Sequence, residues 1–535
     1  MQISPLLPIL CLLAGAVLIV LSTLVRFRWP SLIMVVSTGL AAAAMLPIAQ
    51  QLPSTVIALD WRPATLLGSA VSLRVDTAAW LFGLALLLAG FAVGVTWLVV
   101  PAQGQSAPRA LVLAMLAVGL ASVFAANLLT LAISWGLLDA LFCLTLLARG
   151  GRVSPQGASG SGRRAQMVLG LNGLATLSLW LVAVLIEQDH LSPYWHLLIL
   201  PANARLLIGL AAALRLGLYP LHMWQPIELV GELDRAILIY LIPAAAGLSL
   251  WVRLSAIQGL PEGNLWPTIA LITALIGGIQ AWLQSDPRES LPHLALGYGG
   301  LLILSATATG STTAALVAGS ASWLLGLTLF FMGRPFTRTT WPWASLSSLG
   351  VASLAGLPLT IGYVGRLGFY RGLMAGPVWM LVVSMLAETL LISAMLRRLT
   401  TPDVEPSLPK GIPAHVGYAI ALAVAAAPLL LAGVIRVPTA QPMLSMTASA
   451  WVAWAIPLAG AAVLTFIARQ VRPRTSNWGA VLGKVVRLDW LYSMLLPLMR
   501  SPARVGLLLA DLLEGDAAFL WMLVILALVL LYVRG

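Results

Sequence analysis

The chain has 535 residues, of which 60% are hydrophobic and only 9% charged, and its mean hydropathy is +0.97. A soluble domain cannot bury so much apolar surface, so the composition excludes a soluble globular protein and predicts one whose main solvent is lipid. The net charge of +12 does not indicate a nucleic-acid partner, because the basic residues are spread over short connecting segments.

Sixteen apolar segments are long enough to cross a bilayer. They lie near 5–25, 31–51, 77–99, 110–127, 128–148, 168–186, 206–224, 236–252, 267–283, 293–309, 313–333, 345–370, 377–396, 415–435, 449–468 and 516–533. The fourth and fifth are nearly continuous and are split only around Ala126-Asn127. We therefore predict an all-α polytopic membrane protein with about 14–16 transmembrane helices.

The distribution of basic residues predicts the orientation. With the N-terminus outside, 21 Lys and Arg residues fall on inner loops and 7 on outer ones. This bias follows the positive-inside rule and indicates a multi-pass protein of a bacterial-type cytoplasmic (inner) membrane. The first apolar segment lacks a basic n-region and a small-residue cleavage site, so we expect it to be retained as a span.

Four regions are predicted along the chain: N-terminal helices in 1–108, two groups of five helices in 109–256 and 257–400, and C-terminal helices in 401–535. Among the connecting segments, 150–166 is rich in Gly and Ser and is expected to be an inner loop. The stretch around 488–512 mixes apolar and charged residues, as in an amphipathic helix lying along the membrane or a partner subunit.

Four ionisable residues fall inside predicted spans: Asp139, Arg215, Arg366 and Glu388. A charge at the centre of a membrane helix costs at least about 2.5–3.5 kcal/mol, so such residues face a protein interior or a polar pathway. Two are acids and two are bases, and each acid can compensate a base. A structural salt bridge and a transport role explain this pattern about equally well.

Two of these spans are also interrupted by helix-breaking residues. Gly217 and Pro220 follow Arg215 in the seventh span, and Gly356 and Pro358 precede Arg366 in the twelfth. The two spans hold corresponding places in helices 4–8 and 9–13, and an odd number of helices per group makes the repeats inverted. Paired broken helices in inverted repeats indicate a transport site at mid-depth.

His222 and Tyr298 are candidate stations between the two charged pairs. Histidine titrates in the physiological range, although a single buried histidine is more often a hydrogen-bonding brace. Arginine stays protonated, so Arg215 and Arg366 are suited to stabilising an anion rather than to carrying a proton.

Motifs for self-contained redox or ATP-driven chemistry are absent from the sequence. It contains no CxxC, no HExxH, no Walker loop and no Gly-rich dinucleotide fingerprint. Cys11 and Cys143 both lie in apolar segments, which argues against a disulfide or a cysteine metal site. We therefore expect no cofactor and no metal.

Four segments carry a resemblance to a known family. LRLGLYPLHMWQP and AGLPLTIGYVGRLGFYRG resemble the seventh- and twelfth-helix signatures of the antiporter-like subunits of NADH:quinone oxidoreductase (complex I) and of Mrp-type cation/proton antiporters. DPRESLPHLALGYGGLLILS and SWGLLDALFCLTLLA are similar to the D-x-K-R-x-L-A-Y-S-S and F-W-E segments of the same family. The resemblance covers roughly residues 70–400.

The resemblance implies two inverted half-channels joined by a polar axis, along which protons pass between a Glu/Lys pair, a relay and an exit residue. Its two lysines fall on Arg215 and Arg366, and its fifth-helix glutamate falls on Gly136, one turn from Asp139. The relay positions fall near Ile239-Tyr240, Ser322 and Gly326. The resemblance thus implies the fold and a polar axis with altered residues.

Three functions follow as hypotheses. The first is an antiporter-like membrane subunit of a complex I-type assembly that takes part in proton translocation, with other membrane subunits as partners, protons or Na⁺ as the moving ion, and no catalysis of its own. The second is a structural and coupling subunit without a proton path. The third is a subunit of an Mrp-type antiporter or of an inorganic-carbon uptake complex.

Overall fold

The computed structural model describes most of the chain. The described residues are 4–24, 29–60, 70–99, 106–150, 155–224, 233–257, 259, 263–284, 287–308, 313–333, 341–400, 412–434 and 448–470. The chain divides into two units, Met1–Gly483 and Lys484–Gly535, and the described residues all lie in the first. The predicted span at 516–533 and the amphipathic stretch at 488–512 lie outside the described residues.

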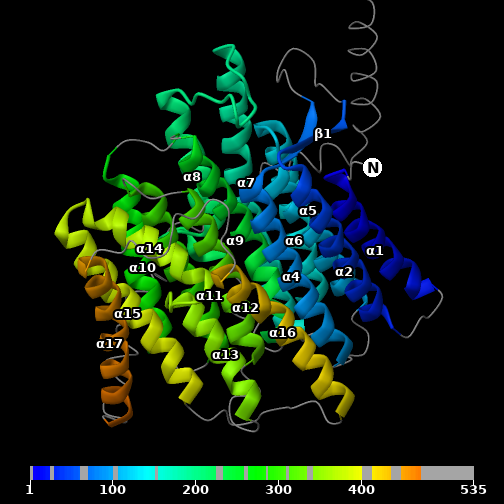
Figure 1. Cartoon of the computed structure of the whole chain (residues 1–535). Helices are drawn as coiled ribbons and strands as arrows, with labels where there is room; N and C mark the ends of the chain where they lie inside the picture. Colours follow the sequence, from blue (N-terminus) through cyan, green and yellow to red (C-terminus); the bar gives the residue numbers. More distant parts are fainter. Residues whose placement is uncertain are drawn as a thin grey trace, which may run out of the picture. The chain divides into compact units, whose positions relative to one another are not determined.

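Helices form almost all of the described structure (Figure 1). They are α1 (Leu6–Leu24), α2 (Pro30–Ile48), η1 (Ala49–Gln51), α4 (Thr77–Val99), α5 (Ser106–Phe124), α6 (Leu128–Gly150), α7 (Pro155–Gln188), α8 (Ala202–Leu216), η2 (His222–Trp224), α9 (Leu233–Ala256), α10 (Leu265–Leu283), α11 (Pro287–Thr307), α12 (Thr313–Gly333), α13 (Trp341–Leu354), α14 (Ile361–Met374), α15 (Val378–Thr400), α16 (Ile412–Val434) and α17 (Ala448–Gln470). Each of the first fifteen predicted spans coincides with one helix or with a broken pair.

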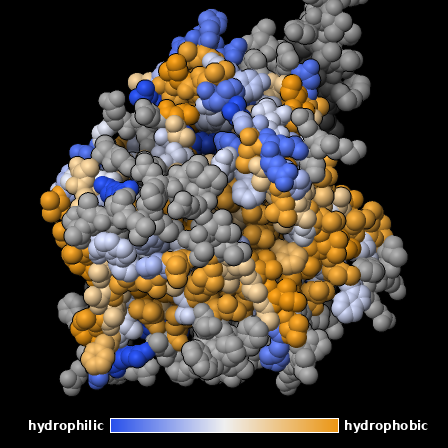
Figure 2. All heavy atoms as spheres, viewed as in Figure 1, coloured by the Kyte–Doolittle hydropathy of each residue, from blue (hydrophilic) through white to orange (hydrophobic). Residues whose placement is uncertain are grey.

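The length and surface of these helices fit a bilayer. Among the described residues, ten helices are long and apolar enough to cross a membrane. Large apolar side chains stand on their outer faces, such as Val17 at 57% and Phe466 at 62% exposure. Figure 2 shows hydrophobic residues over much of the surface in this view. Exposing such a side chain to water costs about 1.5–3 kcal/mol, whereas lipid solvates it. The prediction of an all-α polytopic membrane protein is confirmed.

A small β-hairpin is the one departure from the all-α prediction within the described residues. β1 (Ser54–Leu59) pairs antiparallel with β2 (Val71–Val75), between α2 and α4. Both strands are rich in β-branched residues, which favour extended structure. The apolar segments predict only a non-spanning stretch at 51–74, and the hairpin forms within it.

The hairpin is joined to the break between α5 and α6. The side-chain amide of Asn127 donates to the Ala70 carbonyl at 2.8 Å and to the Ser72 hydroxyl at 3.0 Å. Its carbonyl oxygen accepts from the amide and the hydroxyl of Thr130, both at 2.8 Å. Arg253 of α9 donates to the carbonyl of Ala125 in the same break. The predicted split around residues 126–127 is therefore a helix break held by specific hydrogen bonds, and we call it the junction at Asn127.

The prediction of an inner loop at 150–166 is wrong for residues 155–166, which are helical. α7 begins at Pro155 and runs for 34 residues, well beyond the roughly 20 that cross a bilayer. Each Gly or Ser costs a helix at most about 1 kcal/mol relative to Ala. Once a long helix has nucleated, adding a residue is cheap, so the transmembrane part extends through this segment.

Two groups of helices share one packing pattern. In the first, α5 to α9 contact each other in order and α9 returns to α5. In the second, α10, α11, α12, the α13–α14 pair and α15 do the same, and α15 returns to α10. This parallel supports two five-helix repeats, whereas the boundaries 109–256 and 257–400 and the inversion stay predictions.

A glycine in the left-handed conformation ends a helix in each group. α8 ends at Leu216 because Gly217 adopts φ +76°, and the amides of Gly217 and Leu218 both bond back to the Ala213 carbonyl. α13 ends at Leu354, before Gly356 with φ +70°. A side chain disfavours this conformation by about 1–2 kcal/mol, so glycine fits both places. Pro220 and Pro358 follow the two glycines and prevent the helices from continuing.

Candidate functional site

The first buried ion pair joins α6 to α8. Asp139 and Arg215 are 3% and 0% exposed, and one guanidinium nitrogen of Arg215 donates to Asp139 Oδ1. The other terminal nitrogen donates to the Trp135 carbonyl at 3.0 Å, and the guanidinium carbon lies 4.5 Å from the centre of the Trp135 ring. Thr176 of α7 donates to Asp139 Oδ2 at 2.8 Å. Both buried charges therefore have partners within the protein.

Arg215 occupies the last turn of α8, where its positive charge complements the negative end of the helix dipole. α9 packs directly on this turn, because a Cβ added to Gly247 would lie 2.9 Å from the Leu216 nitrogen. The indole of Trp224 donates to the Leu214 carbonyl at 2.9 Å and covers the same helix end. Packing from two directions holds the arginine in place.

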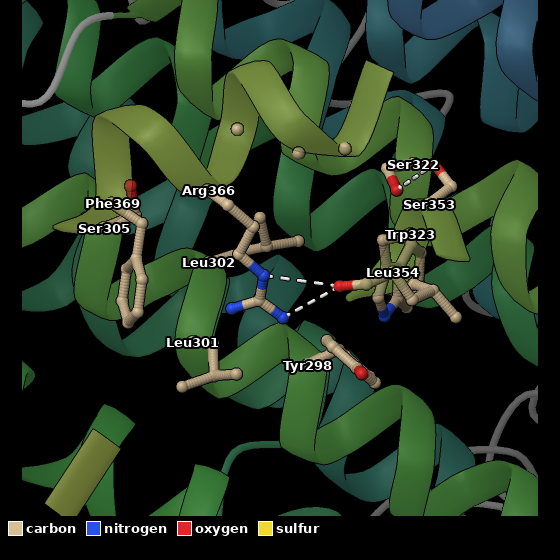
Figure 3. Close-up of a pocket in the computed structure, with 13 residues that line it drawn as sticks. Tyr298, Leu301, Leu302, Ser305, Ser322, Trp323, Ser353, Leu354, Arg366 and Phe369 are labelled. Carbon is tan, nitrogen blue, oxygen red and sulfur yellow. Dashed lines mark hydrogen bonds between the residues drawn. The ribbon is translucent and has the colours of Figure 1, made fainter. Parts of the chain in front are cut away.

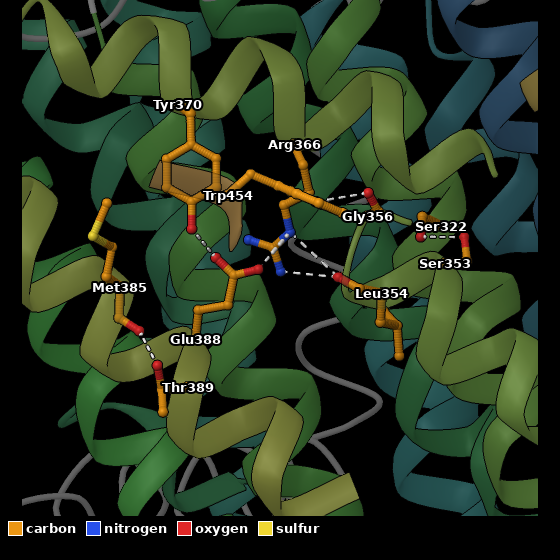
Figure 4. Close-up of polar contacts among 10 residues, drawn as sticks. All are labelled: Ser322, Ser353, Leu354, Gly356, Arg366, Tyr370, Met385, Glu388, Thr389 and Trp454. Atoms are coloured by element: carbon orange, nitrogen blue, oxygen red, sulfur yellow. Dashed lines mark hydrogen bonds and ion pairs between the residues drawn. The ribbon is translucent and has the colours of Figure 1, made fainter. Parts of the chain in front are cut away.

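The second buried ion pair joins α14 to α15 (Figure 4). Arg366 Nε lies 3.2 Å from Glu388 Oε1, and the Tyr370 hydroxyl donates to Glu388 Oε2 at 2.5 Å. Both charged residues are buried, at 7% and 1% exposure. This pair therefore repeats the first: one arginine, one carboxylate and one hydroxyl donor.

Arg366 also bonds to the end of α13. Its Nε and Nη2 donate to the Leu354 carbonyl at 3.3 and 3.0 Å. Leu354 is the last residue of α13, and carbonyls at a helix C-terminus lack helical partners. The guanidinium thus satisfies a carbonyl that the helix break leaves exposed, and each arginine lies against one break.

A cavity of about 30 Å³ adjoins Arg366. Its polar lining comes from Tyr298, Ser305, Ser322, Ser353 and Arg366, and the Ser322 and Ser353 hydroxyls lie 2.8 Å apart. Figure 3 shows the Arg366 guanidinium pointing toward the Leu354 carbonyl, with Tyr298 beside it. A cavity of this size has room for about two waters.

The structure places the six sequence-predicted candidates in three locations. Asp139 and Arg215 form the first pair. Arg366 and Glu388 form the second, and the ring of Tyr298 lies 5.3 Å from the Arg366 guanidinium carbon. His222 lies in the first helix break, buried and stacked on Tyr219 with 5.3 Å between ring centres. Tyr298 therefore belongs to the second pair instead of standing between the two.

Sequence reasoning missed four partners of the charged groups: Trp135, Thr176, Tyr370 and the Leu354 carbonyl. Trp135 lies four residues before Asp139 and Tyr370 four residues after Arg366 on the same helices. Helical spacing of this kind places side chains on one face and would have indicated both. Thr176 and Leu354 reach the site through tertiary packing, for which the sequence carries no comparable signal.

Three positions at which the resemblance implies a glutamate or a relay residue hold Gly136, Ile239 and Tyr240. Gly136 lies beside the first pair, and a Cβ added to it would meet only Thr176 Cγ2, at 3.8 Å. Ile239 and Tyr240 on α9 are buried, and the Tyr240 hydroxyl donates to the Pro292 carbonyl of α11 at 3.2 Å. Within the described ranges, no three His, Cys, Asp or Glu side chains lie close enough to hold a metal ion.

The arrangement has a limited chemical repertoire. An arginine cannot lose its proton in a protein, so Asp139 and Glu388 are the groups that can change charge within the two pairs. Breaking a buried pair by neutralising one partner leaves the other charge uncompensated, at a cost of about 3–5 kcal/mol. Together the fold and the site define a class: a polytopic membrane protein with a buried arginine–carboxylate pair at each of two broken helices.

Comparisons with known proteins specify this class further. No protein-family model matches the chain. It is 30% identical over 210 residues to NADH-quinone oxidoreductase subunit N of Cereibacter sphaeroides, an alignment that covers 36% of this chain and 46% of that protein. The chain spans about half the length of the curated relatives it matches, which are subunit N and chain 2 proteins of this oxidoreductase. They confirm the predicted resemblance to the antiporter-like subunits of complex I.

Solved structures agree on the fold over nearly the whole chain. The Mrp complex from Dietzia sp. DQ12-45-1b superposes with a TM-score of 0.71 at 18% identity, covering 99% of this chain and 63% of that one. A chain of the membrane-bound sulfane sulfur reductase, an archaeal respiratory membrane complex, gives 0.66 at 17% identity and covers 98% and 99% of the two chains.

Proposed function

We propose that this chain is an antiporter-like membrane subunit of a complex I-type assembly and contributes to proton translocation. The relatives' names and the shared fold support this assignment. The observation that carries it is the pair of buried arginine–carboxylate contacts, each at a helix break. The chain has no catalysis of its own in this proposal, and quinone reduction belongs to partner subunits.

Protons move through the carboxylates and not through the arginines. Protonation of Asp139 or Glu388 weakens its ion pair and leaves a positive charge on Arg215 or Arg366 that repels the next proton until the first has left. The cavity beside Arg366 is lined by the hydroxyls of Ser322 and Ser353 and has room for waters that would link them to the second pair. Water and hydroxyl groups thus take the place of the family's side-chain relay.

The proposed setting is a bacterial-type cytoplasmic membrane, with the N-terminus outside and other membrane subunits as neighbours. The bias of basic residues supports the orientation, and the relatives' membership of multi-subunit oxidoreductases supports the partners. The moving ion is the proton, and Na⁺ is the alternative.

Cross-membrane proton flux in proteoliposomes that hold the assembly tests the proposal. Wild type is compared with Arg215→Ala and Asp139→Asn, and we expect flux to fall at least about tenfold in both, since each leaves one buried charge unpaired. If both variants translocate protons normally, this ion pair has no transport role.

A second function is favoured by the residues at the altered positions. Arginines hold both lysine positions, and Gly136, Ile239 and Ser322 stand where the family places titratable groups. A structural and coupling subunit would need no titration there. It predicts unchanged transport in Asp139→Asn, whereas deletion of residues 470–515 would disrupt assembly.

The third hypothesis is a subunit of an Mrp-type antiporter or of an inorganic-carbon uptake complex, and the likeness to the Mrp complex is the reason to test it. Genes beside this one discriminate the three: quinone-module genes support the complex I-type assembly, and small Mrp-type genes or a large zinc-containing partner support the third.

A further inference from the structure

A tryptophan from outside the two five-helix groups reaches the second helix break. Trp454 lies on α17, and its indole nitrogen donates to the Gly356 carbonyl at 2.9 Å. Figure 4 shows this contact between Trp454 and Gly356 at the break. Backbone carbonyls at a helix break lack helical donors, and Trp454 of α17 supplies a donor to the Gly356 carbonyl.

Gly356 is also the residue on which Arg366 rests. A Cβ at Gly356 would lie 2.2 Å from Arg366 Cγ, so the arginine stem runs directly over the glycine Cα. Two carbonyls at the break accept from different donors: that of Leu354, the last residue of α13, accepts from Arg366, and that of Gly356, two residues later, accepts from Trp454. A shift of the Trp454 indole therefore moves the backbone that supports the arginine.

α17 holds the other half of the ion pair as well. A Cβ at Gly460 would lie 3.1 Å from Thr389 Cγ2, and Thr389 follows Glu388 on α15. One turn further along α15, the Ser393 and Thr465 hydroxyls lie 3.0 Å apart. One helix thus contacts both the break beside Arg366 and the helix that carries Glu388.

We propose that Trp454 is a positioning residue, through which α17 sets the geometry of the Arg366–Glu388 pair. The effect on ion movement rests on the proposed function; the effect on the break does not.

The structural half is tested on the full chain in nanodiscs by hydrogen–deuterium exchange. Trp454→Phe keeps an aromatic ring and removes the donor, and Trp451→Phe, one turn earlier on α17, is the matched control. Losing one hydrogen bond to a buried carbonyl corresponds to about 2- to 12-fold in an equilibrium. We expect exchange of amides in 351–366 to rise by about that factor in Trp454→Phe only, with 208–224 of the first break unchanged.

The functional half uses proton flux in the assembled complex, with Trp454→Phe, Glu388→Gln and the double variant. If Trp454 acts through the ion pair, Trp454→Phe lowers flux alone and adds nothing in the Glu388→Gln background. Equal exchange in Trp454→Phe and Trp451→Phe overturns the positioning role. Normal flux in Glu388→Gln overturns the proposed function at this pair, while the exchange result still decides whether α17 holds the break.

Discussion

The first ion pair makes a sharp prediction about stability. Asp139→Asn keeps the volume of the side chain and removes its charge, and Thr176 retains a hydrogen-bond acceptor. Arg215, which is fully buried, then has no counter-ion. From the cost of an uncompensated buried charge, we expect the free energy of unfolding to fall by about 3–5 kcal/mol. Arg215→Met alone leaves Asp139 unpaired and lowers stability by a similar amount.

The double variant Asp139→Asn/Arg215→Met carries no charge at the first pair, and replacement of a whole buried pair by neutral groups of similar volume is often close to neutral. The stability loss of the double variant should therefore be smaller than the sum of the losses in the two single variants. The coupling energy should be at least about 2 kcal/mol. Unfolding of the full chain by SDS titration, followed by circular dichroism, measures all four proteins. A coupling energy near zero would show that the two charges do not depend on each other in the folded chain and would refute the reasoning.

Three further predictions concern the second pair and the breaks. Tyr370→Phe removes the hydroxyl that donates to Glu388 and should lower the free energy of unfolding by about 1.5–3 kcal/mol and reduce proton flux, whereas unchanged stability and flux would contradict the role of this hydrogen bond. Gly356→Ala should lower the free energy of unfolding by more than the about 1–2 kcal/mol that a side chain at positive φ costs, because its Cβ would also strike the Arg366 stem, and a smaller loss in the same SDS assay would contradict this. Ser322→Val should fill the cavity beside Arg366, remove the hydrogen bond to Ser353 and lower flux at a cost in stability of about 1–3 kcal/mol, and normal flux would show that ions do not pass through this cavity.

The sequence predicted the fold well because its strongest signals act locally. Apolar length places a helix in lipid without reference to its neighbours, and Gly217 and Gly356 mark breaks through their own backbone preference. The hairpin at 54–75 and the N-terminal part of α7 were missed for the same reason. A strand depends on its partner, and a helix that continues through Gly and Ser depends on the turns already formed.

The sequence predicted which charged residues belong to the candidate site but not how they are paired. Opposite charges at membrane depth had to be compensated, which selected Asp139, Arg215, Arg366 and Glu388 from the sequence. Which acid meets which base, and that Arg366 bonds the Leu354 carbonyl, depend on helix packing that only the structure gives. Trp454 contributes from a helix outside both groups, and nothing in its local sequence points to the break.

The junction at Asn127 fixes one member of the first ion pair. It ties the start of α6 to the hairpin, and Asp139 lies eleven residues further along that helix, about 16 Å away by the rise of an α-helix. Arg215 lies in the last turn of α8, two residues before the Gly217 turn, where α9 and Trp224 pack on the helix end. The two charges are therefore held in different ways: the carboxylate by the anchored start of its helix, and the arginine by packing at the end of its own.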